Sequence, residues 1–215
     1  MRNEATLAAL PRVPPPDPGY LDTDRVRSLL GVADGDPLAV GLYLMAYLRL
    51  RRGEALGLSW ADVDPDARTL YVRRNLVRVA NPVGGWRLVL SEPETAKSRR
   101  HLGIPAPLGD ILAAHRRDQQ RLALLVAMPR PGCDSPVVAT GDGGRADPDN
   151  FTKCVVRMGK RAGIPALATL FTGDPLTVRR GGNRDHCRCA WALLGGAHRE
   201  HVREGARRWE VGGTG

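Results

Sequence analysis

Three short strand-like runs follow one another near the middle of this chain, and turn-forming residues separate them. They cover residues 69–79, 86–91 and 99–105, with NPVGG and EPETAKS between them. Strand-forming residues bounded by Gly, Pro, Asn and Ser are typical of short β-strands joined by tight connections. The three runs therefore predict a small antiparallel meander.

Helical spacing of apolar residues occurs on both sides of these runs. Before them, Thr23 is placed to cap a short helix, and Asp36 with Pro37 is placed to open a longer, apolar one. A third helical stretch, LRRGEALGL, follows directly. After the strand-like runs, the spacing returns over residues 108–126, and Asn150 is placed to cap another helix. The pattern predicts a mainly helical chain around the strands.

The charge of the chain points to a polyanionic partner. Its 215 residues carry a formal net charge of +9, and its isoelectric point is about 10.1. Such an excess attracts nucleic acid and makes the binding depend steeply on salt. An arginine-rich composition inherited from a GC-rich genome is the alternative explanation.

The sequence shows neither a membrane span nor a disulfide framework. No apolar run approaches the roughly twenty residues that a span requires, and the amino end lacks the blocks of a signal peptide. The four cysteines are too few and too unevenly spread for a stapled fold, and the HCRC cluster at residues 186–189 lacks a second cysteine pair nearby for zinc. We expect a soluble, cytoplasmic protein with reduced thiols and no metal.

The two ends of the chain differ from its centre in composition. Residues 1–21 contain PRVPPPDP, which favours extended backbone and predicts a linker. Residues 172–215 mix Arg, Gly, Cys, His and Trp with little amphipathic period. We interpret this tail either as a segment without a fold of its own or as the product of a shifted reading frame.

One arginine stands out directly after the apolar helix, because Arg51 and Glu54 form an Arg, any, any, Glu pattern. A guanidinium group donates two hydrogen bonds to phosphate oxygens and stays charged at any working pH. The alternative is that Arg51 belongs to a solvated run with Arg49 and Arg52.

The stretch LRLRRGEALGLSWADVD, the three strand-like runs and RRHLGIPAPL together resemble the amino-terminal half of the catalytic domain of tyrosine recombinases, the phage-integrase family, over roughly residues 22–165. The resemblance implies an α+β fold, mainly helical with a small three-stranded antiparallel sheet. It also implies strand breaking and rejoining in double-stranded DNA without a cofactor. Residues 1–21 would then connect to a core-binding domain, and residues 22–171 would form a partial catalytic domain.

The resemblance also assigns roles to the active-site candidates. Arg51 is expected to hold the scissile phosphate as its charge develops, and Glu54 to orient an arginine. Lys97 is either the general acid for the leaving oxygen or a solvated hairpin lysine, since Glu94 stands where relatives commonly have a lysine. Arg49 replaces a glycine that relatives usually have two positions before the active arginine.

Four further arginines are candidates for contacts with the DNA backbone: Arg73, Arg74, Arg99 and Arg100. Contacts of this kind position a duplex without reading its bases. The alternative is that they serve solubility on exposed strands.

The remaining residues of the family's active site are missing. None of the five histidines has an arginine three positions later, and no tyrosine follows Tyr71. We therefore predict a DNA-binding chain that is inactive in covalent catalysis. It would act as a non-catalytic modulator, as a homo-oligomer or beside an intact integrase on DNA, or it would be a decayed fragment with no selected function.

Overall fold

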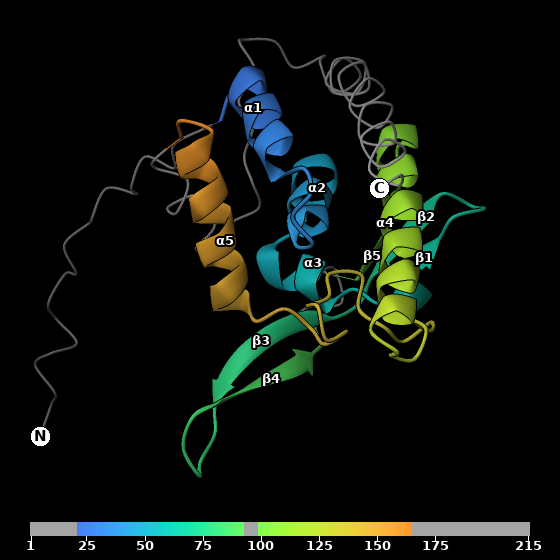
Figure 1. The fold of residues 1–215 in the computed structure, drawn as a ribbon, viewed down its shortest axis with the longest axis vertical. Helices are drawn as coiled ribbons and strands as arrows, with labels where there is room; N and C mark the ends of the chain where they lie inside the picture. Colours follow the sequence, from blue (N-terminus) through green and yellow to red (C-terminus); the bar gives the residue numbers. More distant parts are fainter. Residues whose placement is uncertain (1–20, 93–98, 165–215) are drawn as a thin grey trace, which may run out of the picture.

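The computed structural model describes residues 21–92 and 99–164, which form helices and two small antiparallel sheets (Figure 1). The elements are α1 (Thr23–Ala33), α2 (Ala39–Leu48), α3 (Arg52–Gly57), a 3-10 turn η2 (Trp60–Asp62), β1 (Val63–Asp64), β2 (Thr69–Val72), β3 (Asn75–Ala80), β4 (Trp86–Ser91), β5 (Arg100–Gly103), α4 (Ala106–Leu125) and α5 (Pro148–Arg161). The expected α+β class, mainly helical with a small antiparallel sheet, is confirmed.

Aspartates rather than the expected residues cap two of the helices. The carboxylate of Asp22 accepts a hydrogen bond from the backbone N–H of Arg25 at 2.8 Å, so α1 is capped one residue before Thr23. Asp147 caps α5 by accepting from two backbone N–H groups, including that of Asn150 at 3.2 Å. Pro148 fits the first helical position because it has no N–H to leave unpaired. Helix α5 therefore begins earlier than the sequence predicts.

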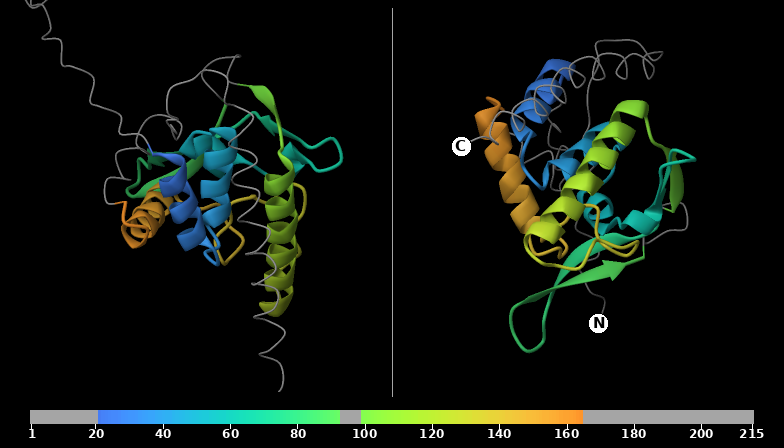
Figure 2. Two further views of the ribbon diagram at one scale, coloured as in Figure 1. Left: turned by 90° about the horizontal axis from the view of Figure 1, so that it is seen from above. Right: turned by 45° about the vertical axis from the view of Figure 1, so that its right-hand side comes forward.

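The strands pair differently from the expected meander. Residues 69–79 do not form one strand: β2 ends at Val72, and β3 begins at Asn75. Strands β1, β2 and β5 form an antiparallel three-stranded sheet in that order, while β3 and β4 form a separate two-stranded hairpin. The last strand-like run therefore pairs with the first half of the first run, not with the second run. The hairpin projects from the body of the fold (Figures 1 and 2).

The core is built around α2, which packs against α1, α3 and α4. This helix contains no charged residue and buries most of its length, as expected for a helix with partners on several sides. Helix α5 approaches it closely, since a Cβ atom on Gly41 would lie 2.7 Å from the ring of Phe151. The fully buried side chains include Leu42, Leu44, Met45 and Leu56.

Several expectations lie outside the described residues. They are the linker before Leu21, the tail at 172–215, Lys97 and the HCRC cluster. Within the described ranges, no helix combines the length and apolar character needed to cross a membrane.

Candidate functional site

Arg51 occupies the position just before the first turn of α3 and is exposed. Its extended backbone directs its N–H into the helix terminus, where it donates to Oε2 of Glu54 at 2.9 Å. Glu54 is 4% exposed and lies one turn into the helix. The Arg, any, any, Glu spacing thus forms half of a capping box, which fixes the backbone from which the Arg51 side chain extends.

Glu54 orients an arginine, but that arginine is Arg100 on β5. Nη1 of Arg100 donates to Oε1 at 2.9 Å, and Nη2 donates to Oε2 at 2.9 Å. The hydrogen bonds to Glu54, opposed by burial, raise the pKa of Arg100. Oε2 of Glu54 therefore accepts from both Arg51 and Arg100, and places these two residues side by side. One carboxylate faces two guanidinium-bearing residues, so this cluster carries an excess positive charge.

The three neighbouring arginines 49, 51 and 52 do not form one solvated run. Arg49 ends α2 in the left-handed conformation, with φ of 53°. Nη1 of Arg52 donates to Oγ1 of Thr152 at 2.7 Å and so connects α3 to α5. Arg49 and Arg51 are both exposed, whereas Arg52 is partly buried, and only Arg51 lies at the capped start of α3.

Arg73 and Arg74 lie at the break between β2 and β3, and both contact the carboxylate of Asp62. Nη2 of Arg74 lies 2.8 Å from Oδ2, and the Asp62 side chain is 1% exposed. Burial alone would raise the pKa of Asp62, but hydrogen bonds from Arg74, from the Ser59 backbone and from Arg73 outweigh it and lower the pKa. Both arginines therefore pair with one buried carboxylate, although the Arg73 side chain remains 41% exposed.

Arg99, the remaining backbone-contact candidate, pairs with Glu92 across the gap between the two described ranges. Its side chain is about half exposed. Lys97 is not among the described residues, so its position relative to Arg51 stays a prediction from the sequence.

A basic stripe on α5 was not anticipated from the sequence. Lys153, Arg157, Lys160 and Arg161 are all exposed, at spacings that place them along one side of the helix. Arg157 lies 3.7 Å from the carboxylate of Asp36. In the sequence, the basic residues of FTKCVVRMGKR recur at helical spacing. This spacing indicates a basic face once the opposite face of α5 is seen to be buried.

Burial or ring stacking holds each tyrosine that the structure describes. Tyr43 is buried, its hydroxyl donates to the carbonyl oxygen of Leu30 at 3.3 Å, and burial raises its pKa. Burial also raises the pKa of Tyr47. Tyr71 stacks on His101 of the neighbouring strand, with ring centroids 4.3 Å apart.

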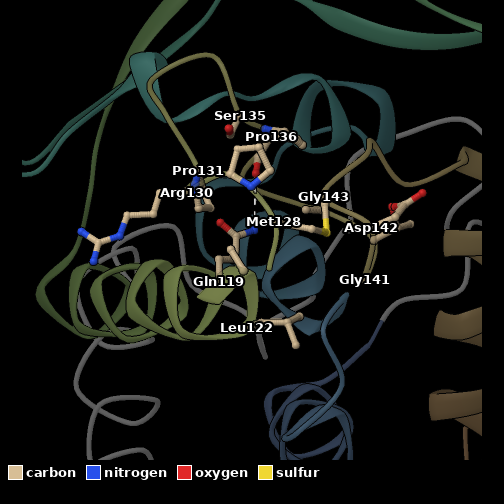
Figure 3. Close-up of a pocket in the computed structure, with 14 residues that line it drawn as sticks. Gln119, Leu122, Met128, Arg130, Pro131, Ser135, Pro136, Gly141, Asp142 and Gly143 are labelled. Carbon is tan, nitrogen blue, oxygen red and sulfur yellow. Dashed lines mark hydrogen bonds between the residues drawn. The ribbon is translucent and has the colours of Figure 1, made fainter. Parts of the chain in front are cut away.

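A separate cavity of about 230 Å³ lies between the carboxyl end of α4 and the loop that follows it (Figure 3). Gln119 lines one wall, and its Nε2 donates to the carbonyl oxygen of Pro136 at 3.4 Å. The cavity shares no lining residue with the cluster of Arg51, Glu54 and Arg100. Across residues 21–92 and 99–164, no three His, Cys, Asp or Glu side chains come together as a metal site would require.

Comparison with known proteins finds relatives and solved structures that are similar to part of the chain. No family model matches the chain. It is 28% identical to an integrase of Mycobacterium phage L5 over 130 residues, which are 60% of this chain and 32% of that protein. It is 30% identical to a tyrosine recombinase XerC-like protein of Caldanaerobacter subterraneus subsp. tengcongensis over 131 residues, which are 58% of this chain and 34% of that protein. The chain thus spans about a third of the length of these curated relatives.

Two solved structures of the Tn1549 transposon integrase share the fold. One, in complex with transposon right end DNA, gives a TM-score of 0.52 at 15% identity, covering 79% of this chain and 56% of that one. The other, in complex with a circular intermediate DNA, gives a TM-score of 0.55 at 15% identity, covering 90% of this chain and 56% of that one.

Proposed function

We propose that this chain binds DNA and contacts backbone phosphates through Arg51 and Arg100. Its sequence and fold resemble the catalytic part of tyrosine recombinases and integrases. Family resemblance supports a place in DNA integration or recombination. The partner is double-stranded DNA, on which the chain meets a second copy or an intact integrase.

The proposal rests on the shared oxygen of Glu54. Because Oε2 accepts from the Arg51 backbone and from the Arg100 guanidinium, both side chains start from fixed, adjacent positions. A held Arg100 guanidinium beside a fixed Arg51 backbone loses less conformational freedom on binding than two independent surface arginines. Arg51 is exposed and Arg100 is partly exposed, so a phosphate from solvent reaches the cluster.

Charge explains why a phosphate backbone suits this cluster. Each guanidinium group remains protonated at any working pH and offers planar, paired donors to phosphate oxygens. Neutralising phosphates releases counterions from DNA, so affinity falls steeply as salt rises. Arg52 joins α3 to α5, the helix that carries the basic stripe, and this stripe adds positive charge to the described part of the chain.

We propose that the chain binds DNA without cleaving it. Transfer of a strand to the enzyme requires a tyrosine hydroxyl as nucleophile, and the sequence contains no tyrosine after Tyr71. Tyr43 is buried and Tyr71 stacks on His101, which leaves neither poised for attack. A non-catalytic modulator of an intact integrase fits this combination better than an independent recombinase.

A salt-titrated gel shift tests the proposal. The full chain is titrated onto a duplex at several salt concentrations, together with Arg51→Ala, Arg100→Ala and the control Arg130→Ala, an exposed arginine beside the α4 cavity. Loss of one phosphate contact lowers affinity by about tenfold and reduces the salt slope by about one. Equal effects of all three substitutions, or binding insensitive to salt, would contradict the proposal.

A further inference from the structure

Asp62 follows α3 in the chain and contacts the bend at which residues 69–79 divide between two sheets. Its carboxylate contacts Arg73 and Arg74, the two residues that belong to neither β2 nor β3. Its Oδ2 also accepts from the backbone N–H of Ser59 at 2.9 Å. Asp62 therefore joins the segment that follows α3 to the bend between the strands.

The bend in turn supports α3 through two glycines. A Cβ atom on Gly53 would lie 1.9 Å from Oδ1 of Asn75, and one on Gly57 would lie 2.9 Å from the carbonyl oxygen of Arg74. Gly53 thus packs against the Asn75 side chain at the start of β3, and Gly57 packs against the backbone of Arg74, whose side chain Asp62 holds. Because both contacts are close, a shift of the bend moves the helix with it.

A second arginine fixes the other end of α3. Nη1 of Arg145 donates to the carbonyl oxygens of Leu56 and Leu58 at 3.1 and 3.2 Å, and Nη2 donates to Oγ of Ser59 at 2.7 Å. These bonds anchor the carboxyl end of the helix, while its amino end carries Arg51. The amino end is held by side chains, through Arg52 to Thr152 and through Glu54 to Arg100. Displacement of the bend therefore also changes the position of Arg51.

We infer that Asp62 is a positioning residue for Arg51: it holds the bend against α3 and so sets where the Arg51 guanidinium meets a DNA phosphate. This inference rests on the proposed phosphate-binding role of Arg51. Asp62 itself touches no phosphate, because its side chain is buried and its oxygens are taken by Arg73, Arg74 and Ser59. Arg73 and Arg74 accordingly act as supports for the site rather than as free contacts to DNA.

A double-mutant cycle in the full chain tests the inference. Duplex affinity is measured for wild type, Asp62→Asn, Arg51→Ala and the double variant. Asp66→Asn, at an exposed aspartate nearby, controls for the added positive charge. Asp62→Asn is expected to weaken binding by about three- to tenfold relative to Asp66→Asn, and by less than about twofold when Arg51 is already alanine. The salt slope should fall with it, since a phosphate contact is lost.

Two results would overturn the inference while leaving phosphate binding intact. One is an equal loss from Asp62→Asn with and without Arg51, which would show a general structural effect. The other is tighter binding than Asp66→Asn, which would show that released Arg73 and Arg74 contact DNA themselves. If Arg51→Ala alone changes nothing, the proposed function fails instead.

Asp62→Glu provides the same cycle without a charge change, because it keeps the carboxylate and displaces it by one methylene. Near-ultraviolet circular dichroism of this variant checks that the fold is retained. A loss of affinity that depends on Arg51 supports positioning, and wild-type affinity in this displaced variant contradicts it.

Discussion

Arg100 of β5 and Glu54 of α3 form a two-bond ion pair, with both N–O distances at 2.9 Å, between residues 46 positions apart in sequence. The same carboxylate caps the helix at Arg51. One buried acid thus connects a helix terminus to the edge strand of the three-stranded sheet, so its loss has consequences for both stability and binding.

Glu54→Gln should destabilise the fold by about 1–2 kcal/mol, because the amide retains a cap acceptor but leaves Arg100 without its charged partner. The expected loss of stability is smaller than for a fully buried pair, because the Arg100 side chain is a third exposed and water screens its charge. Urea unfolding measures the change. Glu92→Gln, at the exposed partner of Arg99, is the matched control and should shift stability by less than about 0.5 kcal/mol. Equal shifts would count against the importance of the Glu54 pair.

Arg49→Gly should stabilise the chain by about 0.5–1 kcal/mol, because Arg49 ends α2 with φ of 53°, a conformation that costs a side-chain-bearing residue energy. Thermal and urea unfolding report the gain. The reverse change at Gly35→Ala, where φ is 83°, should lower stability. A destabilised Arg49→Gly variant would show that this arginine makes a compensating contact.

Gly53→Ala should cost more than about 2 kcal/mol, since the new methyl group overlaps Asn75 and approaches the carbonyl oxygen of Leu76 at 2.9 Å. Gly31→Ala on α1, where nothing lies within 4 Å, is the matched change and should stabilise by about 0.5–1 kcal/mol. Chemical denaturation of both variants gives the comparison. Tolerance of alanine at Gly53 would mean that α3 does not rest on β3 as described.

Acid should remove the contribution of Asp62 to stability. Its folded pKa lies below the ordinary value, so the stabilisation is present above the unfolded pKa of about 3.9 and is lost as pH falls from there through the folded pKa. Urea unfolding across this pH range should therefore show a steeper acid decline for the wild type than for Asp62→Asn. Parallel declines would remove the proposed role of this carboxylate in the stability.

A nicked suicide substrate should yield no covalent adduct with this chain. After incubation, denaturing electrophoresis separates free DNA from any protein–DNA conjugate, and an intact tyrosine recombinase serves as the positive control. A conjugate formed by the chain alone would refute the prediction that it lacks covalent chemistry.

Local patterns in the sequence predicted the elements better than the contacts among them. Helical spacing located α1, α2, α4 and α5, and the helical stretch LRRGEALGL located α3. The break at residues 73–74 was missed because it depends on Asp62, which is more than ten positions away, and on two glycines that admit the bend. The strand-forming residues on either side read as one uninterrupted run.

The identity of the arginine that Glu54 orients was also beyond local reasoning. Arg51 is close in sequence and therefore the obvious partner, yet only its backbone N–H reaches the carboxylate. Arg100 arrives through the pairing of β5 with β2, which the expected meander did not include. Because this strand pairing was not predicted, the arginine partner of Glu54 could not be identified from the sequence.

The division of residues 69–79 between two sheets should allow the two halves to open independently. Strand β2 is paired on both edges, by β1 and β5, whereas β3 has β4 as its described partner. In native-state hydrogen exchange, the amides of the hairpin beyond its contact with α3 should open at a lower free energy than those of β2. Two halves of one strand-like run, eleven residues long in the sequence, would then exchange on different timescales.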